Sequence, residues 1–220
     1  NKNNLIVCQK SKIDDWVNHM KKYYPYEVFD LSKKKGLDKF LNYDDKKVGV
    51  INYELTFRRD ELKNLDDFTL LLDESSQIKN EKAKRSKFIL RLNSKNNILL
   101  SGTPVSGKYE EIWSQAKLLG WKISKKRFED NYLIVKKFDY GIGYPIKRVV
   151  GYKNVERLKK KLRSHGAYFM KTDEVMSLPE QINQIIDVDN TKEYRVFLKD
   201  RIIEVEGEEL VGNSSLSRML

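Results

Sequence analysis

The stretch that decides the fold is Phe68-Thr69-Leu70-Leu71-Leu72-Asp73-Glu74-Ser75-Ser76-Gln77-Ile78-Lys79-Asn80, an apolar run that ends in two adjacent acids. The pattern predicts a buried strand that delivers Asp73 and Glu74 to the edge of a sheet where ligands bind in open α/β folds. Adjacent carboxylates suit nucleotide hydrolysis, because one can hold Mg²⁺ directly or through water while the other orients or deprotonates the attacking water. Taken alone, the same residues fit equally well a strand that ends in a solvated acidic turn.

A second apolar run ends in a turn of small residues, Asn97-Ile98-Leu99-Leu100-Ser101-Gly102-Thr103-Pro104. Ser101 and Thr103 carry hydroxyls that can hydrogen-bond towards the acids, and Gly102 permits close approach of the backbone. Pro104 lacks the N–H that a strand interior needs, so it ends the strand. The two motifs at this spacing are a much more specific signal than either motif alone.

Apolar, β-branched runs bounded by polar turns predict strands near residues 4–8, 26–30, 47–52, 68–73 and 97–101. Helices are predicted between them, near residues 12–24, 33–41, 55–65, 80–94 and 108–119. This alternation is typical of an α/β fold with a doubly wound parallel sheet flanked by helices. Trp16 and Trp113 fall on apolar helix faces, so we expect them to pack in the core.

The pattern changes after Gly120, where a small appendage is predicted. Residues 132–152 interleave aromatic and basic side chains around the turn signal Gly141-Ile142-Gly143-Tyr144-Pro145, which indicates a hairpin. Such a hairpin can contact nucleic acid, but we favour aromatics packed on the lobe, since single hairpins need packing to be stable. A helix near 153–163, a closing segment 168–188 and a last stretch 191–220 that starts as a helix follow.

The composition is that of a globular protein with a basic balance: 40% of the 220 residues are hydrophobic and 34% are charged. No apolar run reaches the ~20 residues that span a membrane, and nothing at the N-terminus reads as a signal peptide. Cys8 is the single cysteine, which fits a buried thiol in an intracellular protein, and the isolated His19 and His165 predict no zinc cluster. The net charge of +11 favours a polyanionic partner, although a Lys-rich solvated surface explains it about equally well.

Five stretches together make the chain resemble the Swi/Snf-type DNA translocases of helicase superfamily two, in order and spacing over nearly its whole length. They are residues 5–11 with Trp16, residues 50–55 with Arg58-Arg59, Asp73-Glu74 with Ile78-Lys79-Asn80, residues 101–104 with Glu111-Ile112-Trp113, and residues 169–175 with Leu178-Pro179. The resemblance implies the first RecA-like motor lobe of an enzyme that uses ATP and Mg²⁺ to move on double-stranded DNA.

The resemblance also implies roles for particular residues. Asp73 would hold Mg²⁺ and Glu74 would position the hydrolytic water, while Ser101, Gly102 and Thr103 would couple the nucleotide site to DNA. Four residues that follow strands would touch DNA phosphates: Lys10, Ser11, Asn52 and Tyr53. Such contacts position a protein on DNA without reading its sequence. For Lys10 and Asn52 alone, plain loop solvation is the alternative.

The chain departs from the family pattern at several points. Ser75-Ser76 stands where Ala-His is common, Gln77 replaces a basic residue, and Ser101 replaces a threonine. The sequence contains no Gly-x-x-x-x-Gly-Lys-Ser/Thr phosphate-binding loop, and no motif of a second lobe. We therefore expect part of a larger enzyme, inactive by itself. Two alternatives stay open. One is a different superfamily-two enzyme, such as a strand-separating helicase or a restriction-system translocase, although Ile78-Lys79-Asn80 and Leu178-Pro179 argue against it. The other is a non-enzymatic DNA-binding or scaffold module on a degenerate motor fold.

The expected organisation has three parts. Residues 1–120 form the core of the motor lobe, residues 121–188 close it and carry the hairpin, and residues 189–220 lead as a helix and linker towards a second lobe of the same polypeptide. The expected location is the cytoplasm, in a bacterial, archaeal or phage-encoded intracellular protein, with no membrane partner.

Overall fold

The computed structural model describes residues 3–105, 107–139, 145–170 and 191–200, the short strands at 202–205 and 208–211, and residues 184, 186 and 189. The chain divides into two compact units, Asn1–Phe169 and Met170–Leu220, each of which is considered by itself. In the part of the chain that is described, no helix has the length and apolar character that crossing a membrane requires.

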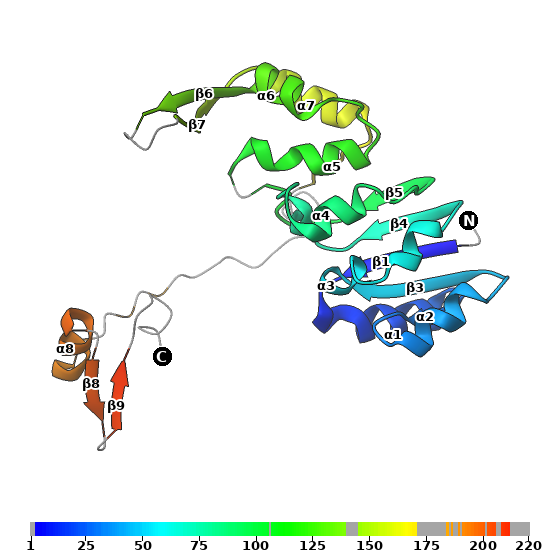
Figure 1. The fold of residues 1–220 in the computed structure, drawn as a ribbon, viewed down its shortest axis with the longest axis horizontal. Helices are drawn as coiled ribbons and strands as arrows, with labels where there is room; N and C mark the ends of the chain where they lie inside the picture. The colour runs from blue at the N-terminus through cyan, green and yellow to red at the C-terminus, as the bar shows by residue number, and fades with distance from the viewer. Residues whose placement is uncertain are drawn as a thin grey trace. The chain divides into compact units, whose positions relative to one another are not determined.

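The first unit is built on a five-stranded sheet in the order β2-β3-β1-β4-β5 (Figure 1). All neighbouring strands pair in parallel. The strands are β1 (Asn3–Cys8), β2 (Glu27–Asp30), β3 (Lys47–Asn52), β4 (Phe68–Leu72) and β5 (Asn96–Leu99). The five predicted strands and the parallel α/β sheet are therefore confirmed.

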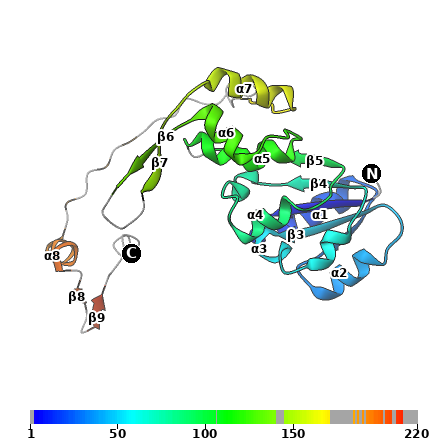
Figure 2. The ribbon, with the colours of Figure 1, turned by 45° about the horizontal axis from the view of Figure 1, so that its top comes forward.

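Alternate residues of the central strand β1 pack into two hydrophobic clusters, one on each face of the sheet. Leu5 and Val7 join a cluster with Leu37 and Phe40 of α2 (Lys34–Leu41), whereas Ile6 and Cys8 join a second cluster against Trp16 of α1 (Ile13–Tyr23). Successive strand residues point to opposite faces, so a strand buried on both sides reads as a continuous apolar run. The parallel sheet is thus covered on both faces (Figure 2).

Two glycines allow close packing around β2 and β3. A Cβ on Gly36 would lie 2.0 Å from the carbonyl oxygen of Asp30, so α2 can start this close to the end of β2 only with glycine there. A Cβ on Gly49, in the middle of β3, would meet the Leu31 side chain at 2.6 Å. Glycine at both positions brings α2 down onto the sheet.

Two predicted helices are shorter than expected. The region 55–65 forms α3 (Tyr53–Thr56) and a 3-10 turn, η2 (Asp60–Asn64), and the region 80–94 contains only α4 (Lys84–Ile89). Before α4, residues 75–78 form another 3-10 turn, η3, and the Arg85 Nε donates to the carbonyl of Gln77 at 2.9 Å. Turns stabilised by such local contacts replace the longer helices that apolar periodicity suggested. The predicted helix at 108–119 appears as η4 (Tyr109–Ile112) followed by α5 (Trp113–Leu118).

A further layer follows α5 and carries the predicted hairpin. It comprises α6 (Lys125–Tyr132), which was not predicted, the antiparallel strands β6 (Leu133–Phe138) and β7 (Ile146–Tyr152), and the predicted helix α7 (Val155–Ser164). Tyr132 is buried and Tyr152 packs on Tyr109, so the expectation of packed aromatics holds at the base. It is wrong for Phe138, which is exposed because β6 extends beyond the lobe.

The second unit contains α8 (Lys192–Asp200), which was predicted, and an antiparallel pair of strands that was not, β8 (Ile202–Val205) and β9 (Glu208–Val211). The predicted turn at 141–144, the motif residues 171–175 and Leu178-Pro179 lie outside the described residues. The three-part organisation proposed from sequence stays a prediction.

Candidate functional site

The acidic turn, residues 73–76, is held between two neighbouring strands. The Asp73 N–H donates to the carbonyl of Val7 in β1 at 2.9 Å, and the Ser75 N–H donates to the carbonyl of Leu100, just past β5, at 2.7 Å. Between them Glu74 has φ +57° and ψ +59°, a left-handed conformation that is uncommon for a residue with a side chain. The flanking hydrogen bonds therefore fix a sharp turn that presents both acids at the carboxyl edge of the sheet.

The Glu74 carboxylate accepts two hydroxyl hydrogen bonds. Its Oε1 accepts from the Ser76 hydroxyl at 2.6 Å and from the Ser101 hydroxyl at 2.9 Å. The Ser101 Oγ in turn accepts from the Thr103 N–H at 3.3 Å. The structure thus brings the acidic turn and the Ser-Gly-Thr turn together, as predicted, and Ser76, where the family often has histidine, orients Glu74.

Asp73 is bound by two aromatic side chains from other parts of the sheet. The Trp16 indole N–H donates to Asp73 Oδ2 at 2.8 Å, and the Tyr53 hydroxyl donates to the Asp73 carbonyl at 2.9 Å. The packing expected of Trp16 is present, since it lies partly buried against the cluster around Cys8. Its hydrogen bond to Asp73 was missed from sequence, because an apolar helix stripe gives no signal that an indole N–H has a functional partner.

Burial shapes the protonation of the groups around the turn. Burial, and then the negative charge of Asp73, raise the pKa of the Cys8 thiol to about 12. The same causes raise the pKa of the Tyr53 hydroxyl. Both groups are therefore neutral near pH 7, and the Tyr53 hydroxyl keeps the proton that it donates to the turn.

The donor set of the acidic turn fits a magnesium ion through carboxylate oxygens, which are the ligands that Mg²⁺ prefers. Trp16 donates to Oδ2 of Asp73 and so restrains this carboxylate, whose other oxygen would be the one to bind a metal. Among the described residues, no group of three or more His, Cys, Asp or Glu side chains forms a preassembled metal cluster. Asp73 would thus hold the ion together with water or nucleotide oxygens rather than within a cage of protein ligands.

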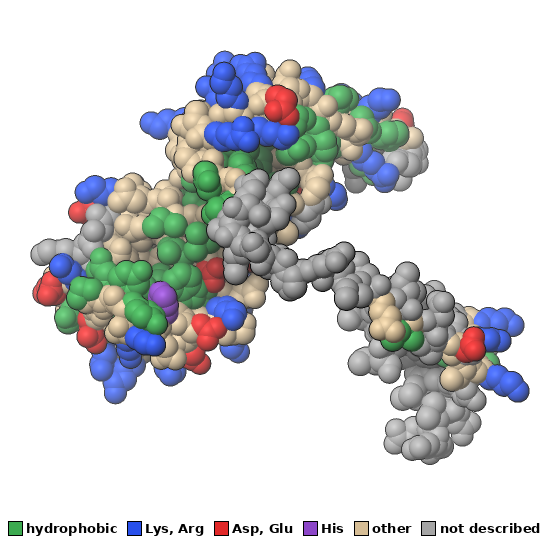
Figure 3. Space-filling model, turned by 180° about the vertical axis from the view of Figure 1, so that it is seen from behind, with side chains coloured by type: hydrophobic (Ala, Val, Ile, Leu, Met, Phe, Trp, Pro, Cys, Tyr) green, Lys and Arg blue, Asp and Glu red, His purple; other side chains and the backbone are tan. Residues whose placement is uncertain are grey.

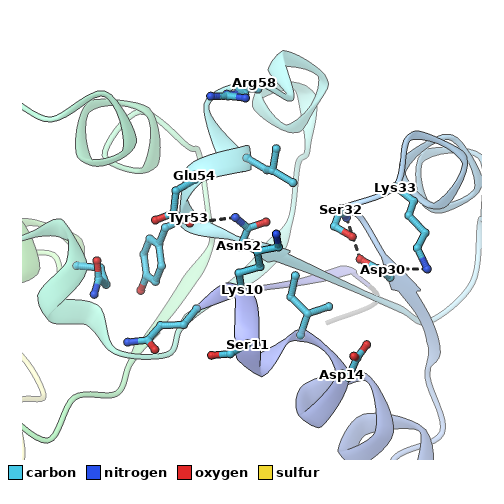
Figure 4. A pocket seen from close by; sticks show the side chains of 14 residues that line it. Lys10, Ser11, Asp14, Asp30, Ser32, Lys33, Asn52, Tyr53, Glu54 and Arg58 are labelled. Atoms are coloured by element: carbon cyan, nitrogen blue, oxygen red, sulfur yellow. Dashed lines mark hydrogen bonds and ion pairs between the residues drawn. The ribbon is translucent and has the colours of Figure 1, made fainter. Parts of the chain in front are cut away.

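A cleft of about 1060 Å³ lies at the same sheet edge, beyond the ends of β1, β2 and β3 (Figure 4). The loop after β1 contributes Lys10 and Ser11, both exposed, and the end of β3 contributes Asn52. Ser32, Lys33 and Arg58 also line the cleft and were not predicted as site residues. Arg58 follows β3 and belongs to a stretch that carries the family resemblance, so its motif was an available signal, whereas for Ser32 and Lys33 the only signal was their position after β2.

Asn52 has an unsatisfied acceptor in this cleft. The residue is 4% exposed, its amide donates to Glu54 Oε2 at 2.9 Å, and its Oδ1 has no hydrogen-bond partner among the described residues. Buried polar atoms are normally satisfied, and an exception invites an explanation such as a ligand or water. Asn52 therefore suits hydrogen bonding to a molecule that enters the cleft.

The roles predicted for Tyr53 and Gly102 stay predictions. Tyr53 lines the cleft, but it is 1% exposed and its hydroxyl donates to the acidic turn, so little of this side chain is open to DNA. A Cβ on Gly102 would meet no heavy atom of the described residues within 4 Å, so nothing in the described fold requires glycine there.

The excess of basic side chains does not by itself mark a binding surface. Lys and Arg are spread over the face in Figure 3, both over the part of the first unit that contains the sheet and over the layer of α6 and α7. The net charge of +11 is therefore consistent with a polyanionic partner without locating it.

A family model and several known proteins that match this chain point to the same family. The family model described as the SNF2-related domain matches residues 1–219. Protein CHROMATIN REMODELING 5 of Arabidopsis thaliana is 24% identical over 90% of this chain and 12% of that protein. The SWI/SNF-related matrix-associated actin-dependent regulator of chromatin subfamily A member 1 of Mus musculus is 28% identical over 80% of this chain and 16% of that protein. The ISWI chromatin-remodeling complex ATPase ISW1 of Saccharomyces cerevisiae is 26% identical over 60% of this chain and 13% of that protein.

Among solved structures, the Sulfolobus solfataricus SWI2/SNF2 ATPase core in complex with dsDNA matches with a TM-score of 0.50 and 23% identity. The match covers 60% of this chain and 28% of that one, and it shows the same fold. The chain spans between 12% and 16% of the length of the curated relatives named above. Because the family model matches nearly the whole chain, the chain belongs to the SNF2-related domain family.

Proposed function

We propose that this chain is part of an ATP-driven motor that moves along double-stranded DNA, and that it forms most of the first RecA-like lobe. The observation that carries the proposal is the 2.9 Å hydrogen bond from Ser101 to Glu74, which joins two motifs at the ligand-binding edge of the sheet. Family membership and a yeast relative named as an ATPase support it.

In this motor Asp73 holds Mg²⁺, directly or through water, and Glu74 orients the water that attacks the terminal phosphate of ATP. When bound, Mg²⁺ neutralises charge on the phosphates. Ser101 and Thr103 link Glu74 to the loop that follows β5, so a movement of this loop would shift the Glu74 carboxylate. Trp16 and Tyr53 keep the acidic turn in place.

Double-stranded DNA lies against the cleft at the strand ends, where Lys10, Ser11 and Asn52 contact its backbone. Phosphate contacts of this kind give affinity without sequence preference and weaken as salt rises. A second motor lobe of the same polypeptide supplies the rest of the DNA track. The 220-residue chain by itself contains no phosphate-binding loop motif, so it hydrolyses little or no ATP.

The deciding experiment measures phosphate release by the full-length protein with and without duplex DNA. We expect DNA-stimulated turnover of order 1 s⁻¹ or more, and its loss in the variant Glu74→Gln, which keeps the size of the side chain and removes the charge. Lys117→Gln, on the exposed side of α5, is the control and should leave turnover unchanged. Turnover that Glu74→Gln leaves intact would overturn the assignment of the acidic turn.

A non-enzymatic DNA-binding or scaffold module remains the second candidate. It is favoured by the serine at position 76, where the family often has histidine, and by the missing phosphate-binding loop motif. The same measurement separates the two candidates, because a scaffold would bind duplex DNA and release no phosphate even as the full-length protein.

A further inference from the structure

The arm formed by β6 and β7, residues 133–138 and 146–152, is anchored at its base. Leu133 is buried, and the Tyr152 hydroxyl donates to Glu110 Oε2 at 2.7 Å. From Ile134 to Asp139 every side chain is exposed. Figures 1 and 2 both show the arm extending away from α6 on the side to which the carboxyl ends of β3 and β4 point. Beyond the base, the two strands of the arm pair with each other. Isolated hairpins of this kind are only marginally stable in water.

The outer part of the arm pairs like charges across its strands. Lys136 lies opposite Arg148 and Lys137 lies opposite Lys147 in the antiparallel register. Neither strand contains an acid, and none of the ion pairs between described residues involves Lys136, Lys137 or Lys147. Like charges directly opposite each other destabilise a strand pair. The pair Lys137–Lys147 thus opposes the pairing of its own strands, and a polyanion would relieve it.

The two like-charged pairs lie on opposite faces of the ribbon, because consecutive strand residues alternate in direction. A protein surface would meet the cations of one face only. The major groove of B-form DNA admits a two-stranded β-ribbon and has phosphates along both of its walls. Exposed apolar side chains near the cations, Ile134, Phe138 and Val150, suit contact with sugars and base edges. Charge and shape together therefore favour duplex DNA as the partner.

The arm also lies next to the segment that follows the acidic turn. Val135 and Lys147 line a hollow of about 610 Å³ together with Lys79 and Lys82. Four acids line this hollow: Glu81 of the segment that follows the acidic turn, Glu110 and Glu111 of η4, and Glu129 of α6. Lys136 and Lys137 follow Val135 in β6, towards the tip of the arm. Lys137 and Lys147 also line a hollow of about 440 Å³ with Glu129 and Asp130 of α6, whereas Lys136 is not among the residues that line either hollow.

We propose that the β6–β7 arm is a second binding site for duplex DNA, separate from the cleft at the strand ends, which contacts the phosphates on both sides of a groove. The identity of the partner rests on the proposed function, in which the chain works on double-stranded DNA. The contact adds affinity without sequence preference, since the residues that carry it are phosphate-binding cations.

The test compares two triple variants that remove the same charge. Lys136→Gln, Lys137→Gln and Lys147→Gln together neutralise the arm, and Lys21→Gln, Lys39→Gln and Lys46→Gln neutralise three exposed lysines before β2 and β3, at the opposite edge of the sheet. Each is titrated with labelled duplexes of two unrelated sequences at several salt concentrations. The arm variant should reduce the slope of log K against log salt by up to about 2.7, or about 0.9 for each lost phosphate contact. The control should keep the slope of the unmodified chain.

Each outcome decides between the claims. If Lys10→Ala weakens binding while the arm variant matches its control, the arm proposal is overturned, the proposed function stands, and an acidic protein becomes the partner to seek. If neither change affects binding, the proposed function fails as well. The arm variant should melt no lower than the unmodified chain, because it removes like-charge pairs. Should it melt lower, the single variant Lys137→Gln, with an expected slope change of about 0.9, takes its place.

Discussion

The acidic turn and the β6–β7 arm are both placed by strands, yet different contacts hold them. Around the turn, backbone hydrogen bonds to Val7 and Leu100 and side-chain hydrogen bonds from Trp16, Tyr53 and Ser101 fix both acids. In the arm, the β6 side chains beyond the base face solvent. Groups that orient a metal and a water must be held closely in place, whereas a surface that meets a long polymer can adapt to it. The two regions therefore suit chemistry and attachment, respectively.

The largest effect that we expect is on the Mg²⁺ dependence of ATPase activity, when the hydrogen bond from Trp16 to the acidic turn is removed. The variant Trp16→Phe keeps most of the packing and removes the indole N–H that orients Asp73. Loss of such a supporting hydrogen bond typically costs about 10–100-fold in metal affinity or activity. In the full-length protein we expect the Mg²⁺ concentration that gives half-maximal ATPase activity to rise by a factor in this range.

Trp113→Phe is the matched control for this prediction. The Trp113 indole donates to the carbonyl of Ile123 at 3.0 Å, away from the acidic turn, so its loss should leave the Mg²⁺ dependence unchanged. Equal behaviour of the two variants would mean that Trp16 acts through general stability. The contacts around the acidic turn would then serve the fold and not the positioning of Asp73.

The next effect is a loss of stability at alkaline pH caused by the buried Cys8 thiol beside the turn. The folded chain keeps the Cys8 proton up to a pKa of about 12, while the unfolded chain releases it near the ordinary thiol value of 9.0. The unfolded state therefore binds fewer protons between these values, and the free energy of unfolding falls as pH rises through them. One group contributes up to about 1.4 kcal/mol per pH unit.

Urea denaturation of the chain and of Cys8→Ala over this pH range isolates the contribution of Cys8. The variant loses packing at every pH, but its stability should decline less steeply above about pH 9 than that of the unmodified chain. Parallel declines would show that the thiol titrates as it does in the unfolded state, and that the region under the turn is more open to water than its burial indicates.

A third effect compares two tyrosines, one at the turn and one at the base of the arm. Tyr53→Phe removes a hydroxyl from a side chain that is only 1% exposed, and leaving its acceptor, the Asp73 carbonyl, unsatisfied costs about 1–3 kcal/mol. Tyr152→Phe removes a hydroxyl that donates to Glu110 from a partly exposed side chain, where water can replace it, so its cost should be smaller. Chemical denaturation of both variants measures the difference. A larger loss for Tyr152→Phe would reverse the assignment of the more tightly held region.

The sequence predicted the sheet better than the details of the site. Buried parallel strands read as apolar runs, and the acids and Ser101 mark strand ends, so their shared edge followed from topology. The roles of Trp16 and Tyr53 could not be read, because each hydrogen bond joins residues far apart in the chain. Tyr53 follows a strand, as a ligand-binding residue would, and only the packing shows that its ring turns inward. The exposure of the arm could not be predicted either, because apolar residues in a strand usually pack in a core, and those of the arm are exposed instead.

The smallest effect belongs to the arm and tests its like-charge pairs directly. The variant Lys147→Glu places an acid opposite Lys137 in the strand register. A cross-strand pair of opposite charges contributes roughly 0.2–1 kcal/mol, so the variant should melt slightly higher than the unmodified chain. It should also bind duplex DNA more weakly, since it loses one phosphate contact and gains a repulsive charge. Thermal melting and duplex titration of the same preparation measure both changes. If the variant gains stability without losing affinity, the arm's cations serve no DNA contact; if it loses both, Lys147 is held by a contact other than the strand pairing.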